Sequence, residues 1–95
     1  MSSSIDYKKD YLYEKLQKKR YAVKYLNAAL ADGDPDVALL AIRDIVEARG
    51  GFSDLSRRTH ISREHLYRML SQKGNPGFKN LVPVLHAYGL ELAVK

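Results

Sequence analysis

The feature that most constrains this sequence is a pair of short helical segments with almost no chain between them, within residues 52–70. Ser53 is a candidate N-cap for the first segment, and Ser62 begins the second after a break at residues 60–61. The second segment carries an apolar stripe formed by Leu66, Met69 and Leu70. Two helices joined by so short a turn must cross steeply and share one small core. The spacing therefore predicts a helix-turn-helix.

The rest of the chain also repeats apolar residues at helical spacing. Asp34 and Pro35 are strong start signals, because aspartate caps free backbone amides and proline tolerates the first helical position. Gly50 follows the other end of this helix, and residues 74–77 form a loop. Further helices are expected near residues 11–17, 19–31, 35–49 and 78–88, with a short strand or an extended tail near 90–94.

The length of 95 residues corresponds to one domain, and an apolar fraction of 45% is ordinary for a globular chain. We expect an all-α fold with a disordered start at 1–9, an N-terminal helical arm at 10–33 and a helix-turn-helix domain at 34–95. The absence of cysteine excludes disulfides and thiolate metal sites. No apolar run approaches the roughly 18 residues that span a bilayer, and the start lacks the apolar segment of a signal peptide. We therefore expect a cytoplasmic protein that does not enter membranes.

The charge of the chain is divided into three segments of alternating sign. The formal charge is +5 at pH 7, from 16 basic and 11 acidic residues. Residues 1–31 carry +4, residues 32–50 carry −3 and residues 51–95 carry +4. A basic excess favours a polyanionic partner, although it also keeps a small domain in solution. The C-terminal basic segment is the first candidate for nucleic acid.

The second helix of a helix-turn-helix lies in the major groove of DNA, where its first residues meet the edges of the bases. Arginine recognises guanine there, and glutamate accepts a hydrogen bond from cytosine. The candidate DNA-binding residues on this helix are Ser62, Arg63, Glu64, Tyr67 and Arg68. The flanking candidates for backbone contacts are Arg57, Lys73, Asn75 and Lys79. From residue 57 to residue 79 the chain has six basic residues and one acidic residue, which fits phosphate contacts.

Other interpretations of the same residues stand beside this one. A helical hairpin with basic surface residues is also a common piece of an α-helical bundle. His60, His65 and His86 lack zinc-ligand spacing, so we expect no metal site and no cofactor. The sequence has no nucleophile–base motif, no glycine-rich phosphate loop and no paired carboxylates, so we expect no enzyme activity.

From Leu16 to Leu92 the chain resembles a family of small prokaryotic and prophage proteins, the HigA-like addiction-module antidotes of the Xre/Cro helix-turn-helix class. The segments that carry the resemblance are YLNAALADGDPDVALLAIRDIVEARGG, SREHLYRMLSQKGNP and FKNLVPVLHAYGLEL. The resemblance implies a fold like the helical DNA-binding domain of phage repressors, such as lambda repressor. It implies a homodimer that binds a palindromic operator in double-stranded DNA, usually at its own promoter. It also implies that the protein neutralises a RelE/HigB-like toxin, an mRNA-cleaving ribonuclease encoded beside it.

The chain departs from the family pattern at three places. Lys18 and Lys19 stand where an Asp-Pro cap is common, so the N-terminal helix starts differently. His60 stands where the turn often has glycine, so a positive φ at this residue would be strained. Ser56 replaces a small alanine, which is a mild change.

The surfaces that meet partners stay open at this stage. The toxin could bind the acidic segment or, equally, the N-terminal helices, and the acidic segment contains Asp32, Asp34, Asp36, Asp44 and Glu47. The candidate dimer interface consists of Phe78, Leu81, Leu85, Tyr88, Leu90 and Leu92, unless most of these side chains are core. The alternatives to an antitoxin are a stand-alone prophage repressor and a purely structural or protein-interaction domain.

Overall fold

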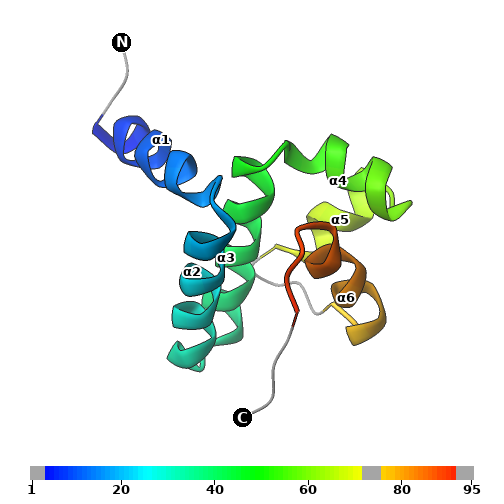
Figure 1. Ribbon diagram of the computed structural model, residues 1–95. Coiled ribbons are helices and arrows are strands. Elements are labelled where there is room, and N and C mark those ends of the chain that lie inside the picture. The colour runs from blue at the N-terminus through cyan, green and yellow to red at the C-terminus, as the bar shows by residue number, and fades with distance from the viewer. Residues whose placement is uncertain (1–3, 72–75, 92–95) are drawn as a thin grey trace.

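The computed structural model describes residues 4–71 and 76–91 of the chain, without the side chains of residues 4–8 and 78. Every regular element in these residues is a helix, which confirms the all-α prediction. The helices are α1 (Ser4–Leu16), α2 (Lys19–Asp32), α3 (Pro35–Ala48), α4 (Gly51–Thr59), α5 (Arg63–Met69) and α6 (Phe78–Ala87) (Figure 1). Lys73, Asn75, Leu92 and most of the expected tail lie outside the described residues.

The hairpin of α2 and α3 follows from local sequence chemistry. Gly33 ends α2 in the left-handed region at φ 87°, where its N–H donates to the carbonyl of Leu30. The carboxylate of Asp34 then accepts a hydrogen bond from the amide of Asp36 at 2.9 Å, with Pro35 as the first helical residue. Because only two residues join the helices, α3 returns antiparallel to α2 (Figure 1).

Helix α1 begins at Ser4, seven residues before the helix start expected near residue 11, and the expected break before α2 is present. The reason is tertiary, because the later part of α1 binds α3. The hydroxyl of Tyr13 donates to Glu47, and the side-chain amide of Gln17 donates to the carbonyl of Ala48. Lys9 also lies 3.7 Å from the Glu47 carboxylate. Local apolar spacing does not reveal such polar contacts across the fold.

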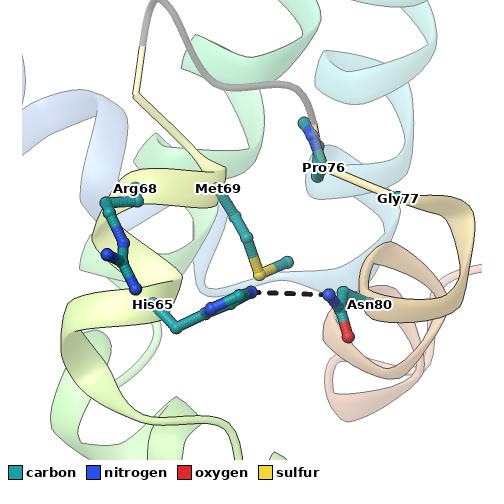
Figure 2. A pocket seen from close by; sticks show the side chains of 6 residues that line it. All are labelled: His65, Arg68, Met69, Pro76, Gly77 and Asn80. Atoms are coloured by element: carbon teal, nitrogen blue, oxygen red, sulfur yellow. Dashed lines mark hydrogen bonds between the residues drawn. The ribbon is translucent and has the colours of Figure 1, made fainter.

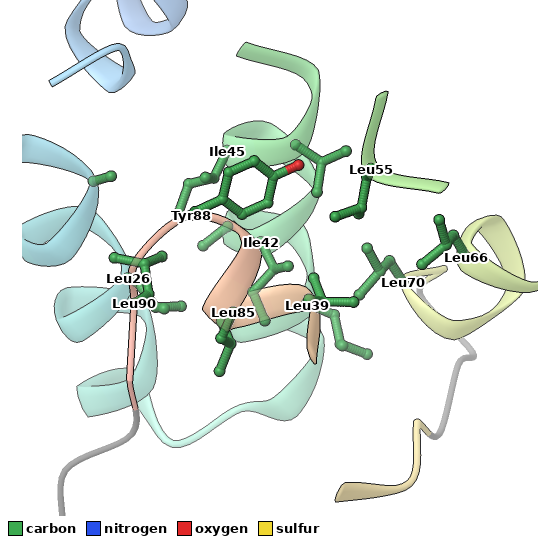
Figure 3. Packing of buried hydrophobic residues seen from close by; sticks show 14 of the residues in the cluster. Leu26, Leu39, Ile42, Ile45, Leu55, Leu66, Leu70, Leu85, Tyr88 and Leu90 are labelled. Carbon is green, nitrogen blue, oxygen red and sulfur yellow. The ribbon is translucent and has the colours of Figure 1, made fainter. Parts of the chain in front are cut away.

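The core lies between α3 and the other helices. The largest side chains with almost no exposed surface are Leu16, Ile45, Val46, Leu55, Leu66, Leu70 and Val84. They come from α1, α3, α4, α5 and α6, and Leu70 directly follows the last residue of α5. Each fully buried aliphatic side chain contributes about 1.5–3 kcal/mol to the stability of the fold. Leu26 of α2 and Leu39 of α3 extend the same cluster (Figure 3). One continuous core thus holds the N-terminal hairpin to the C-terminal helices.

Three of the six candidate dimer-interface residues are core within the single chain, as the alternative interpretation expected. Leu85, Tyr88 and Leu90 are 2%, 5% and 4% exposed, and they pack beside Ile42 and Ile45 (Figure 3). After α6 the chain reverses, and the amide of Leu90 donates to the carbonyl of Leu85 at 2.9 Å. This reversal folds the start of the tail back onto the core. Of the remaining candidates, Leu81 is half-buried, while the side chain of Phe78 and Leu92 lie outside the described residues.

Candidate nucleic-acid interface

The turn between α4 and α5 consists of three residues, and its conformation is set by His60. His60 has φ 62° and ψ 21°, in the left-handed region, so the strain expected from a residue other than glycine is present. The amide of His60 donates to the carbonyl of Ser56 at 2.9 Å, which ends α4. The turn therefore takes a conformation suited to glycine without having a glycine.

Hydroxyl groups hold this turn in place. The hydroxyl of Ser56 donates to the carbonyl of Ile61 at 2.6 Å, so serine at this position binds the turn directly. Thr59 accepts from the amide of Ile61 at 3.3 Å and donates to the carbonyl of Leu55. This role of Ser56 and Thr59 was not predicted from the sequence, although short-range hydrogen bonds of Ser and Thr side chains to the backbone are a recognisable pattern. The turn is therefore fixed by side chains of α4 itself.

Helix α5 is anchored on one side and exposed on the other. Leu66 is fully buried and Met69 is 5% exposed, as their helical spacing predicted. Ser62 caps the helix, because its hydroxyl accepts from the amide of His65 at 3.1 Å. Tyr67 stacks on Phe52 of α4 with ring centroids 4.2 Å apart, yet remains 47% exposed. The stacking joins α4 to α5 through an aromatic pair that sequence spacing did not indicate.

The exposed side of α5 brings together the residues predicted to contact bases. Arg63, Glu64, Tyr67 and Arg68 are all exposed. A guanidinium nitrogen of Arg63 donates to the hydroxyl of Ser53 at 3.0 Å, which directs this side chain toward the start of α4. The group is thus two guanidiniums, a carboxylate and a phenol on one short helix, held by a buried stripe on its other side.

The flanking basic residues fall into different environments. Arg57 pairs with Asp54 but leaves 78% of its side chain exposed. Arg58 lies 3.0 Å from Asp54 and donates to the carbonyl of Ala87, so it also ties α4 to the end of α6. Lys79 is exposed in the first turn of α6. Arg57 and Lys79 are therefore open to a polyanion, whereas Arg58 has a structural role.

A pocket of about 260 Å³ lies between α5 and the start of α6 (Figure 2). The amide nitrogen of Asn80 lies 3.4 Å from Nε2 of His65, and together they form one wall. The pocket is lined by His65, Arg68, Met69, Pro76, Gly77 and Asn80. Arg68 lines it from α5, so the pocket adjoins the exposed side of this helix.

The acidic segment divides into two groups with different surroundings. Asp44 accepts from the hydroxyl of Tyr25 at 2.7 Å, and Glu47 accepts from Tyr13. Burial, with the hydrogen bond to each carboxylate, raises the pKa of both tyrosines well above its usual range. Asp44 and Glu47 therefore bind the N-terminal helices to α3. The other three carboxylates are exposed at the α2–α3 turn, namely Asp32, Asp34 and Asp36.

Within residues 4–71 and 76–91, no three His, Cys, Asp or Glu side chains are placed together to hold a metal ion. None of the helices in the same residues has the length and apolar character needed to cross a membrane.

Comparison with known proteins identifies the family of this chain. A family model described as "Probable addiction module antidote protein" matches residues 7–95. A relative from Haemophilus influenzae, described as an uncharacterized protein, is 39% identical over 71 residues, which cover 75% of this chain and 72% of the relative. No solved structure matches the chain. Because the family model matches almost the whole chain and this relative covers most of it, the chain belongs to the family of probable addiction module antidote proteins.

Proposed function

We propose that this chain is the antitoxin of a type II toxin–antitoxin module, with two linked activities. It neutralises a RelE/HigB-like mRNA-cleaving toxin by direct binding, and it represses its own operon by binding operator DNA. Membership of the antidote family supports the first activity. The observation that carries the second is the exposed group of Arg63, Glu64, Tyr67 and Arg68 on α5.

In this proposal α5 lies in the major groove, and the side chains around it have different roles in binding DNA. Arg63 binds guanine through two hydrogen bonds, and Glu64 accepts from the exocyclic amine of cytosine. Arg57 and Lys79 contact phosphates, which supply affinity without sequence preference. The fixed α4–α5 turn supports this function, because base recognition needs a helix held at one angle to its neighbours.

The test of DNA binding compares two single arginine deletions. Wild type, Arg63→Ala and Arg20→Ala are titrated against the promoter duplex and its single-base variants by fluorescence anisotropy. Arg63→Ala should weaken promoter binding by roughly 1–3 kcal/mol and relax preference at one base position. Arg20→Ala removes the same charge from an exposed site on α2 and should change binding by about twofold or less.

Uniform weakening across all duplexes would show that Arg63 contacts only phosphate. A log–log salt slope near zero would argue against any phosphate footprint and favour a protein-interaction domain. The toxin activity is tested by co-purification with the product of the neighbouring gene. If no complex forms while operator binding persists, the chain is a stand-alone prophage repressor.

We propose a homodimer on the palindromic operator, because a reader this small gains affinity when two copies bind half-sites about one helical turn apart. Light scattering of the free protein and of its operator complex tests this arrangement. A monomer in both samples at micromolar concentration would contradict it.

A further inference from the structure

The α2–α3 hairpin carries an apolar groove that the single chain leaves open. The groove has a volume of about 270 Å³. Val37 and Leu40 of α3 form one side and remain 37% and 48% exposed. It is lined by Tyr25, Ala28, Ala29, Asp32, Val37, Leu40 and Ala41. The volume is below the usual range of about 300–1,000 Å³ for small-molecule pockets, so it suits anchor side chains of a protein segment.

The shape of the groove follows from residue size and from one hydrogen bond. Ala28, Ala29 and Ala41 are small, so the two helices leave a hollow above them. At one end the hydroxyl of Tyr25 donates to Asp44 at 2.7 Å and links the two helices across the hollow. The groove is therefore part of the folded hairpin, because bonded and packed residues define its walls.

The other end of the groove is acidic. Asp32 lines the groove, and Asp34 and Asp36 follow within the same turn, all three exposed. The ion pairs in the described part of the chain involve other carboxylates, Glu47 and Asp54. An occupant that brings a lysine or arginine to this end would therefore form ion pairs that these three carboxylates do not make within the described residues.

The groove lies away from the candidate DNA-binding side. Helix α2 packs only against α1 and α3 among the described helices, and the α2–α3 turn is at the lower left of Figure 1, opposite α4 and α5. A partner in the groove would thus leave the exposed residues of α5 open to DNA.

We propose that the groove binds the toxin, through an amphipathic segment with apolar anchors for Val37 and Leu40 and a basic residue for the aspartates. The inference rests on the proposed antitoxin function and deepens it by naming the surface. An amphipathic helix laid into an apolar groove between helices is a general mode of such binding. Charge complementarity selects a basic segment over an acidic or neutral one.

The experiment measures binding of the purified product of the neighbouring gene to the full chain by isothermal titration calorimetry. Leu40→Ala removes an anchor contact and should weaken binding by about tenfold or more. Asp32→Asn should weaken binding and reduce its salt dependence. Leu30→Ala is the matched control, because Leu30 is 44% exposed on α2 but does not line the groove. The affinity of this variant for the toxin should stay within about twofold of that of wild type. Operator binding should be unchanged in all three variants.

The possible results separate the two levels of the proposal. If wild type binds the toxin and the groove variants bind equally well, the toxin uses another surface and this inference is wrong while the antitoxin function stands. If wild type does not bind, the proposed function fails and the inference fails with it. If Leu40→Ala instead turns a dimer into a monomer on sedimentation and leaves toxin binding intact, a second copy occupies the groove and the inference is overturned. Should Leu40→Ala not fold by circular dichroism, Asp32→Asn alone decides the outcome.

Discussion

Replacing His60 with glycine should stabilise this protein, although the change deletes a whole side chain. His60 has φ 62°, and a residue with a Cβ in the left-handed region is strained by about 1–2 kcal/mol. Glycine removes this strain but makes the unfolded chain more flexible, which costs about 0.4–1 kcal/mol. The difference predicts a net gain of about 0.5–1 kcal/mol in the free energy of unfolding. His60 is exposed, so little packing is lost.

The assay is urea unfolding of wild type, His60→Gly and His60→Ala, followed by circular dichroism. A gain of about 0.5–1 kcal/mol also corresponds to a rise of roughly 2–8 °C in Tm for a domain of this size. His60→Ala removes the imidazole but keeps the Cβ, so it should show no gain. Because glycine takes the same φ, operator binding should be preserved in His60→Gly.

Two results would refute the reasoning. If His60→Ala stabilises as much as His60→Gly, the imidazole and not the backbone conformation causes the effect. If His60→Gly destabilises the protein, the His60 side chain contributes contacts that outweigh the strain. Gly33→Ala is a second check, since Gly33 has φ 87° with no atom near an added Cβ, and the same arithmetic predicts a loss of about 0.5–1 kcal/mol.

Three further predictions concern tyrosines. Tyr88 is 5% exposed, and its hydroxyl has no hydrogen-bond partner among the described residues. Tyr88→Phe should therefore raise the free energy of unfolding by about 1 kcal/mol in urea titrations. A lower free energy of unfolding would instead reveal a partner for the hydroxyl. Burial raises the pKa of Tyr88 to about 12 and also raises the pKa of Tyr13 and Tyr25, so above about pH 10 the native state holds protons that the unfolded state releases. Stability should therefore be complete below about pH 10 and fall as the pH rises further, and a flat profile up to about pH 12 would contradict this. Tyr25→Phe loses the hydrogen bond to Asp44, so it should lower the free energy of unfolding by about 1–2 kcal/mol at pH 7. This variant should also lose less stability than wild type as the pH rises above about 10.

Much of the fold follows from short-range chemistry that is visible in the sequence. The start of α3 at Asp34 and Pro35 and the end of α2 at Gly33 depend on capping and on φ, which involve only neighbouring residues. The inward side of α5 follows from the spacing of Leu66 and Met69. These features were predictable because each is decided within a few residues of chain.

The errors concern residues whose environment comes from distant parts of the chain. The early start of α1 accompanies contacts of Tyr13 and Gln17 with α3, about thirty residues away. Leu85, Tyr88 and Leu90 are equally apolar whether they pack inside one chain or between two, so spacing alone did not assign them to the core.

The candidate site shows the same division. Residues of α5 were predicted as an exposed group, and the structure exposes them together. The stacking of Tyr67 on Phe52 and the bond from Ser56 to the turn were not predicted, because both depend on how α4 and α5 cross. These contacts set the angle at which the predicted side chains are presented.

The sequence by itself determined where the turns lie and which side of α5 faces outward, because capping, backbone freedom and apolar periodicity act over a few residues. Only the tertiary structure decided how the acidic segment is used. Asp44 and Glu47 bind tyrosines of the N-terminal helices, whereas Asp32, Asp34 and Asp36 stay exposed beside the α2–α3 groove. All five carboxylates have the same chemistry in the sequence, and only the packing of α1 and α2 on α3 places a hydroxyl near two of them.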